Sequence, residues 1–289
     1  MRIASSALLA VSAFSIVACS AHKDAYENTV EVLESSKRAP TIQEPSEDPS
    51  IKAQRYRAAA EKGDSTAMLE LGLLYANGAG VSRSYPEALR WYRLSAAKGE
   101  RRAMHNIGYM YQSGLGVRQD YAEALAWYTR AARKGDAPAM TNLGYMHENG
   151  LGVPASNAEA IRWYTMAADA GDAFAMDNLG TMQYAGRGFA RSYPEAFNWY
   201  RKAAQRGFTV SMGRLARMYH RGEGVARNDE YAYAWAALAM DRARSQAERD
   251  EYLPIVVHMA QELDEKGFER AKRLKNELAE AIPVHSENL

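Results

Sequence analysis

One stretch in the middle of the chain contains the pattern that decides its fold. Residues 127–163 read WYTRAARKGDAPAMTNLGYMHENGLGVPASNAEAIRW. The stretch begins and ends on tryptophan, and the same step of 36 residues relates all the tryptophans, which are Trp91, Trp127, Trp163, Trp199 and Trp235. A methionine column keeps the step as well: Met68, Met104, Met140, Met176 and Met212. A fixed period of this length indicates a repeat architecture.

The glycines follow the same period. Four columns begin at Gly63, Gly72, Gly78 and Gly80, and they hold every one of the 21 glycines except Gly213 and Gly267. Small residues at fixed positions let helix axes approach one another, while tryptophan and methionine fill the space between layers. The columns therefore predict a packed core, and we assign no ligand to the tryptophans or to the Gly-x-Gly pairs.

Each unit is predicted to be a pair of helices. In the second unit Ala103, Ile107 and Tyr111 are four residues apart, which predicts a first helix from about 101 to 112. Gly114 is expected to end that helix in the left-handed conformation. The expected capping boxes that start the second helices are Ser84/Glu87, Asp120/Glu123, Ser156/Glu159 and Ser192/Glu195. The second helix of this unit should bury Ala124, Trp127, Tyr128 and Ala132.

Composition excludes several classes of protein. Of the 289 residues 47% are hydrophobic and 25% charged, which is typical of a globular chain. The formal net charge of +1 gives no global signature of nucleic-acid binding, and a single cysteine excludes an intramolecular disulfide. Residues 51–240 nevertheless carry 24 basic against 17 acidic groups. A basic solenoid between acidic flanks favours an acidic partner surface or an anionic polymer, and a solvated arginine-rich exterior is an equally weighted alternative.

The amino terminus resembles a bacterial lipoprotein signal. Residues 1–18 have a short basic start and an apolar segment too short to span a bilayer, and Ile16-Val17-Ala18-Cys19 resembles a lipobox. Cys19 is therefore the expected lipidation site, and Ser20 after it favours the outer membrane of a Gram-negative cell. Residues 19–50 are rich in proline and acid, which predicts a flexible linker. An ordinary secretion signal is the alternative.

The repeat itself resembles a known family. Ala132-Arg133-Lys134-Gly135-Asp136-Ala137-Pro138-Ala139-Met140-Thr141-Asn142-Leu143-Gly144, followed by Gly150-Leu151-Gly152-Val153 and Trp163-Tyr164, is similar to the Sel-one-like repeat, a relative of the tetratricopeptide repeat. The resemblance covers about residues 51–240. It implies an all-α fold, an α/α solenoid wound as a right-handed superhelix, that presents surfaces to protein partners. Repeat five departs from the motif and is expected to fray or cap differently, at Phe208, Ala216, Tyr231 and Ala236.

Both ends of the solenoid are expected to be capped. Tyr56 to Lys62 matches the end of a second helix, which predicts a lone helix from about residue 50. We therefore expect the five-repeat solenoid to occupy residues 51–244 and capping helices to occupy residues 245–289. Ser245 predicts a helix start, Pro254 a new helix or a kink, and Gly267 a break. A partner-binding helix is the alternative interpretation of the C-terminal segment.

No motif predicts catalysis, a cofactor or a metal. The Gly-x-Gly pairs join helix to helix, whereas a dinucleotide fingerprint joins strand to helix. The six histidines lack ligand spacing. Ser20-Ala21-His22-Lys23 matches the Ser-x-x-Lys string of penicillin-recognising enzymes, but it lies in the linker. The cysteine-rich relatives linked to β-lactams contain disulfide bonds, whereas no repeat of this chain contains a cysteine. A β-lactam-related hydrolase is thus a remote alternative.

Partner binding is expected on the first helices, which line the concave face of tetratricopeptide arrays. Asparagines there can clamp an extended backbone, and tyrosines add contact area at low entropic cost. The candidate residues are His105, Asn106, Tyr109, Thr141, Asn142, Tyr145, Asp177, Asn178, Arg214 and Arg217. An equally weighted alternative is that the asparagines bond to the neighbouring helix.

These features together predict a non-enzymatic protein-interaction scaffold or adaptor in the periplasm or at the outer membrane. The membrane is expected to be contacted only through the lipid anchor, and nucleic acid is not an expected partner. Relatives of this layout include envelope-assembly and secretion scaffolds, immunity proteins against type VI phospholipase effectors, and host-interaction proteins. A receptor for peptidoglycan or anionic polysaccharide is the alternative from another class.

Overall fold

A computed structural model describes residues 48–283, and every regular element in that range is a helix. The expected signal peptide, Cys19 and nearly all of the expected linker lie outside the described residues. The helices are α2 (Pro49–Glu61), α3 (Ser65–Asn77), α4 (Tyr85–Ala97), α5 (Arg101–Ser113), α6 (Tyr121–Arg133), α7 (Ala137–Asn149), α8 (Asn157–Asp169), α9 (Ala173–Ala185), α10 (Tyr193–Gln205), α11 (Thr209–Arg221), α12 (Asp229–Asp241), α13 (Gln246–Gln261) and α14 (Glu265–Ala281). Within this range no helix combines the length and apolarity needed to cross a bilayer.

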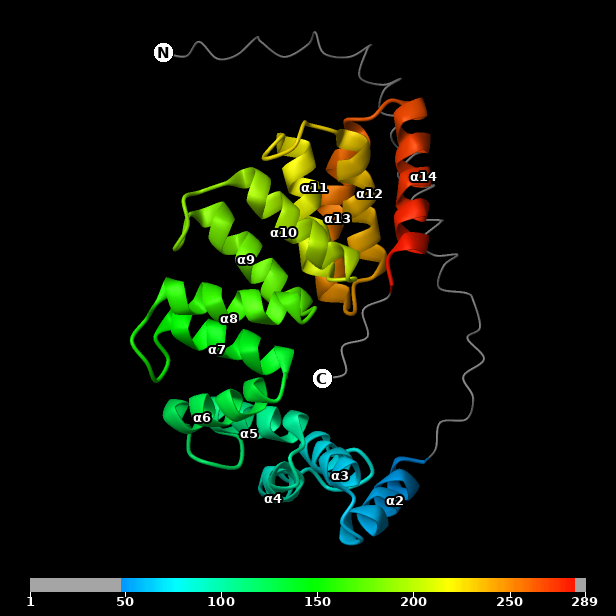
Figure 1. Cartoon of the computed structure of the whole chain (residues 1–289). Coiled ribbons are helices and arrows are strands. Elements are labelled where there is room, and N and C mark those ends of the chain that lie inside the picture. The colour runs from blue at the N-terminus through cyan, green and yellow to red at the C-terminus, as the bar shows by residue number, and fades with distance from the viewer. Residues whose placement is uncertain (1–47, 284–289) are drawn as a thin grey trace, which may run out of the picture.

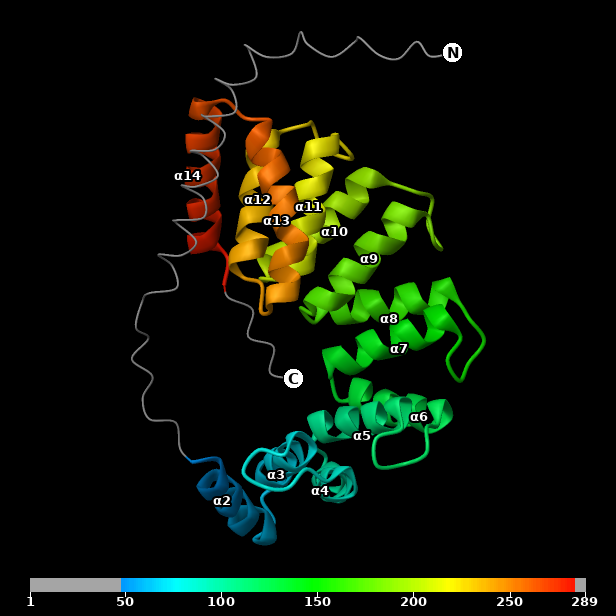
Figure 2. The same cartoon turned by 180° about the vertical axis from the view of Figure 1, so that it is seen from behind.

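The helices form five stacked pairs, which confirms the predicted all-α solenoid. The first helices are α3, α5, α7, α9 and α11, and each packs mainly on the second helix that follows it, namely α4, α6, α8, α10 and α12. Each second helix also contacts the first helix of the next pair. The stack bends into an arc that runs from α2 to α14, with α3 and α5 toward the inside of the bend and α4 and α6 outside (Figure 1). The reverse view shows the same arc (Figure 2).

Helix ends follow the predicted signals closely. The five first helices end on a glycine in the left-handed conformation, for example Gly114 at φ 69°. The second helices α4, α8 and α10 begin where a serine hydroxyl accepts the backbone N–H of the expected glutamate. The glutamate half of two capping boxes differs from the prediction, because Glu87 and Glu159 instead pair with arginines one turn on, Arg90 and Arg162.

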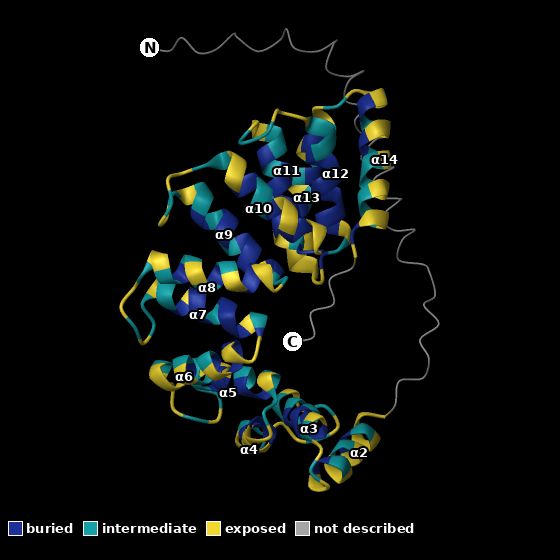
Figure 3. Cartoon of the chain, viewed as in Figure 1, coloured by how far each residue is buried: buried dark blue, intermediate teal, exposed yellow. Residues whose placement is uncertain are grey.

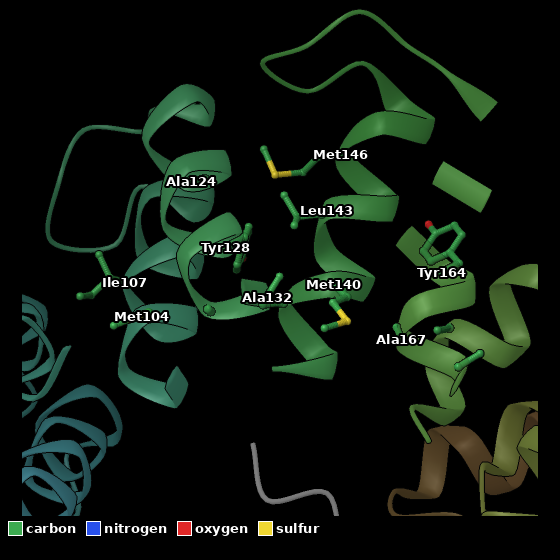
Figure 4. Close-up of a cluster of buried hydrophobic side chains, with 14 of the residues drawn as sticks. Met104, Ile107, Ala124, Tyr128, Ala132, Met140, Leu143, Met146, Tyr164 and Ala167 are labelled. Atoms are coloured by element: carbon green, nitrogen blue, oxygen red, sulfur yellow. The ribbon is translucent and has the colours of Figure 1, made fainter. Parts of the chain in front are cut away.

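In the first four repeats the core is built from a glycine on the first helix and a tyrosine on the second helix. Tyr128 and Tyr164 are completely buried, and their rings lie over Gly108 and Gly144. Met104, Ile107, Met140 and Leu143 fill the space around them, with contributions from consecutive pairs (Figure 4). Burying a large side chain of this kind stabilises the fold by roughly 1.5–3 kcal/mol. Each pair therefore depends on its neighbours for its core.

The tryptophans are less buried than the sequence predicts. Trp91 and Trp235 are buried, but Trp127, Trp163 and Trp199 are only half-buried. The exposed ring of Trp127 is covered by the Arg130 guanidinium, 4.4 Å from the ring centroid, and Lys202 covers Trp199 in the same way at 4.1 Å. In the three middle repeats the tryptophans therefore pack against the edge of the core, and the tyrosine column fills its buried centre.

Repeat five does not fray. α11 and α12 have the same length as the preceding helices, and Ala216 and Ala236 are fully buried. These alanines occupy the positions of the glycine and the tyrosine in the other repeats, so α12 has no ring here with which the Cβ atom of Ala216 could clash. The repeat does cap differently, because Phe208 provides no side-chain hydrogen bond to the start of α11.

The C-terminal helices cover the last pair, with one correction to the predicted boundaries. Pro254 lies inside the single helix α13, which excludes a new helix start and leaves the predicted kink as the other option. Gly267 lies in the first turn of α14, so the break falls earlier, at the N-cap Asp264. Gly213, which is outside the periodic columns, lies directly against the ring of the buried Tyr252 of α13. The side of α14 that faces away from the stack is exposed (Figure 3), as expected for a cap.

Candidate protein-binding surface

The inner face is the surface that the first helices present between their buried positions. Two of the predicted residues are prominent on it. Tyr109 of α5 is 51% exposed and Tyr145 of α7 is 45% exposed, at equivalent positions of adjacent repeats. Neither side chain makes a hydrogen bond or ring contact with any other residue of 48–283. Large aromatic side chains left uncovered in this way are available for contact with another molecule.

A second group of predicted residues joins adjacent repeats instead. The Asn142 amide nitrogen donates to Nε2 of His105 at 2.9 Å, which ties α7 to α5. The amide nitrogen donates to Nε2 when this ring nitrogen carries no proton. Burial lowers the pKa of His105, which also favours the neutral ring. For Asn142 the structure thus supports the alternative of a bond to the neighbouring helix.

Thr141 and Asp177 are buried, so they offer no surface to a partner in this arrangement. Thr141 donates to the Asp172 carboxylate at 3.0 Å. Asp177 accepts from the Ser211 hydroxyl at 2.6 Å and pairs with the Arg214 guanidinium at 2.9 Å, which links α9 to α11. Burial raises the pKa of Asp177, while Arg214 and Ser211 oppose that shift. These residues and Arg214 hold successive repeats together.

Two further predicted residues have side chains that are available to a partner. Arg217 of α11 is half-buried and has no carboxylate within ion-pair distance among residues 48–283. Asn178 of α9 is half-buried and makes no side-chain hydrogen bond in the same range. Asn106 differs from them, because its amide interacts with Tyr92 and His105. Of the ten predicted residues, those with side chains available to a partner are thus Tyr109, Tyr145, Asn178 and Arg217.

Sequence reasoning missed the exposed apolar residues near the start of the first helices. Phe174 of α9 is 48% exposed and Val210 of α11 is 42% exposed. Both are the second residue of their helix, and they lie one turn before the predicted residues Asn178 and Arg214. The sequence contains a signal for them, because Phe174 and Val210 are 36 residues apart and occupy the same position of the repeat. The earlier repeats have Thr66, Arg102 and Pro138 at this position.

The described residues offer exposed contact groups and no metal-binding cluster. Within residues 48–283 there is no cluster of three His, Cys, Asp or Glu side chains placed to hold a metal ion. The charged groups of the first helices are largely satisfied internally, as in the pairs Glu70–Arg102 at 3.7 Å and Asp177–Arg214 at 2.9 Å. What remains is a set of aromatic and polar side chains on successive first helices, which suits contact with a protein segment.

The fold and this surface define a helical-repeat solenoid. The Sel1 repeat model matches five consecutive segments, which are residues 65–100, 101–136, 137–172, 173–208 and 209–242. The chain therefore belongs to the Sel1 repeat family. The Sel1 repeat fold is typically a non-catalytic scaffold for protein interactions. No curated protein matches the sequence.

Several solved structures are similar to this chain. A Sel1 repeat protein from Oxalobacter formigenes is 26% identical, with 79% of this chain and 99% of that chain covered and a TM-score of 0.65. A protective antigen of uropathogenic Escherichia coli with the same repeat is 26% identical, with 81% and 57% covered and a TM-score of 0.46. An immunity protein from Pseudomonas aeruginosa is 19% identical, with 85% and 83% covered and a TM-score of 0.47. The last two superpose too loosely to bear on function.

Proposed function

We propose that the chain is a protein-binding scaffold that holds a segment of its partner against the inner face of the solenoid. The observation that carries this proposal is the pair Tyr109 and Tyr145, half-exposed at equivalent positions on α5 and α7, with no side-chain hydrogen bond or ring contact in residues 48–283. Tyrosine gives a large contact area at low entropic cost and is enriched where binding energy is concentrated.

The proposal extends to location. The lipobox-like sequence before Cys19 supports attachment to the outer membrane, with the solenoid in the periplasm. Labelling with radioactive palmitate tests this part alone. Incorporation that is lost in Cys19→Ser supports the anchor, and labelling that is absent or unchanged in that variant removes it.

Capture with the full chain tests binding and identifies the role. Wild type is compared with the Tyr109→Ser/Tyr145→Ser variant and with a control, Leu94→Ser/Met166→Ser, whose two side chains are each 41% exposed on the second helices. We expect a protein retained by wild type and control but not by the tyrosine variant. A secreted phospholipase among the captured proteins indicates an immunity function, whereas a secretion or envelope component indicates scaffolding.

The alternative of a polysaccharide receptor has weaker support. The basic excess of the solenoid favours it, but Arg102 and Arg214 of the inner face already pair with carboxylates. A pull-down on purified peptidoglycan or anionic polysaccharide separates the two classes. Retention that falls with added salt and is unchanged by Tyr109→Ser/Tyr145→Ser favours the polysaccharide.

A further inference from the structure

The junction between the fourth and fifth repeats departs from the pattern of helix caps. The earlier first helices each begin with an acidic side chain that accepts a backbone N–H, and these residues are Asp64, Glu100, Asp136 and Asp172. At the same position α11 has Phe208, which gives no such hydrogen bond. The start of α11 therefore lacks both the negative charge and the acceptor that the other first helices have.

The missing acid is replaced by an apolar surface. The ring of Phe208 is buried against the ring of Phe174, with centroids 4.5 Å apart. Phe174 itself is 48% exposed, and Val210, two residues after Phe208, is 42% exposed. An apolar patch thus spans the starts of α9 and α11.

A cation lies at the same junction. The Arg206 guanidinium donates to the backbone carbonyl of Gly171 at 3.1 Å, three residues before Phe174. No carboxylate in residues 48–283 lies within ion-pair distance of Arg206. The carboxylate closest in sequence to Gly171, Asp172, already accepts from the Ala175 N–H and from Thr141. The junction therefore combines an apolar patch with a guanidinium that makes no ion pair in residues 48–283, and the N-terminus of α11 adds partial positive charge.

We propose that this junction docks a segment of the partner protein in which an apolar or aromatic side chain lies next to a carboxylate. The apolar group covers Phe174 and Val210, and the carboxylate pairs with Arg206 and accepts from the backbone N–H groups at the start of α11. The inference rests on the proposed function as a protein-binding scaffold, but it names a different patch from Tyr109 and Tyr145 and a definite partner chemistry.

A small probe tests the chemistry directly. N-acetyl-L-phenylalaninate carries an aromatic ring and a carboxylate, and its titration into the nitrogen-15-labelled protein is followed by NMR. We expect saturable shifts of the Thr209 and Val210 amide signals, with a Kd on the order of 1 mM for so small a ligand. N-acetyl-L-phenylalanine amide, which lacks the charge, should bind roughly tenfold more weakly. N-acetylglycinate, which lacks the ring, should give no saturable shift.

Two variants complete the test. Phe174→Ser removes an exposed side chain and should abolish the shifts, whereas Leu94→Ser, equally accessible on α4, should titrate as wild type does. The inference is overturned if the uncharged amide binds as well as the carboxylate, if Phe174→Ser titrates as wild type does, or if no probe binds. Each of these outcomes leaves the result of the capture experiment with Tyr109 and Tyr145 unaffected.

Discussion

Gly144 of α7 lies so close to Tyr164 of α8 that a Cβ atom on the glycine would be 2.6 Å from ring carbon Cδ1. The same relationship recurs in the pairs Gly72–Tyr92, Gly108–Tyr128 and Gly180–Tyr200. Only a residue without a Cβ lets the buried ring lie flat against the first helix. The glycine column is therefore required for close packing, and not for an unusual backbone conformation.

We expect Gly144→Ala to destabilise the protein. The added methyl group must displace the buried Tyr164 ring or the backbone of α7, and overpacking of this kind costs about 1–3 kcal/mol. Urea unfolding followed by circular dichroism measures the change.

The double variant Gly144→Ala/Tyr164→Ala checks the cause. Since the clash disappears with the ring, the double variant should lose less stability than the sum of the single variants. Repeat five carries this combination naturally, as Ala216 and Ala236. Strict additivity would show that Gly144 acts through the unfolded chain and not through Tyr164.

Tyr128→Ala should cost more stability than Trp127→Ala. Tyr128 is completely buried, so its removal leaves a cavity worth about 3–5 kcal/mol. Trp127 is half-buried and its removal should cost about 1–2 kcal/mol. Denaturant midpoints of the two variants provide the comparison, and the reverse order would mean that the tryptophan column is the main core after all.

Arg214→Met tests the link between α9 and α11. The change leaves the buried Asp177 carboxylate with only the Ser211 hydroxyl as a partner, which we expect to destabilise the protein by about 2–4 kcal/mol. Adding Asp177→Asn removes the unpaired charge and should recover part of that loss. Thermal unfolding of the single and double variants measures both effects. If Arg214→Met leaves stability unchanged, Arg214 is not needed to hold α9 against α11 and becomes a candidate for partner binding.

Stability should fall on mild acidification because of His105. Its pKa is lowered in the folded protein, chiefly by burial, although the nearby carboxylates of Asp136 and Asp172 oppose the shift and Arg102 adds to it. Below pH about 6.5, the pKa of histidine in the unfolded chain, the unfolded protein binds a proton at His105 that the folded protein does not. Protonation therefore favours unfolding, and the free energy of unfolding decreases as the pH falls below neutral.

The measurement is the change in Tm between about pH 7.5 and about pH 5.5, in wild type and in His105→Gln. Glutamine cannot take up a proton in this range, so the change in Tm should be smaller in the variant. An equal change in both proteins would assign the acid sensitivity to other groups.

The period of 36 residues was sufficient to predict the helices, their ends and their stacking, because caps and terminal glycines act locally. It was not sufficient to predict which face of a helix is buried. Tyr128 and Trp127 are adjacent in sequence, and the packing of α6 on α5 places the Tyr128 ring against Gly108. The same limit explains why the sequence predicts Thr141 and Asp177 to be surface residues, since their partners Asp172 and Ser211 lie at or in the first helix of the next helix pair.

Photo-crosslinking tests the central claim, that the inner face binds a protein, most directly. p-Benzoylphenylalanine is placed at position 145 on the inner face or, in a matched control, at position 94 on α4, and the cells that produce the full chain are irradiated. We predict a discrete crosslinked protein from position 145, absent from position 94 and reduced when Tyr109→Ser is added. Crosslinks from position 94 with none from position 145 would contradict the account and place the binding surface on the second helices.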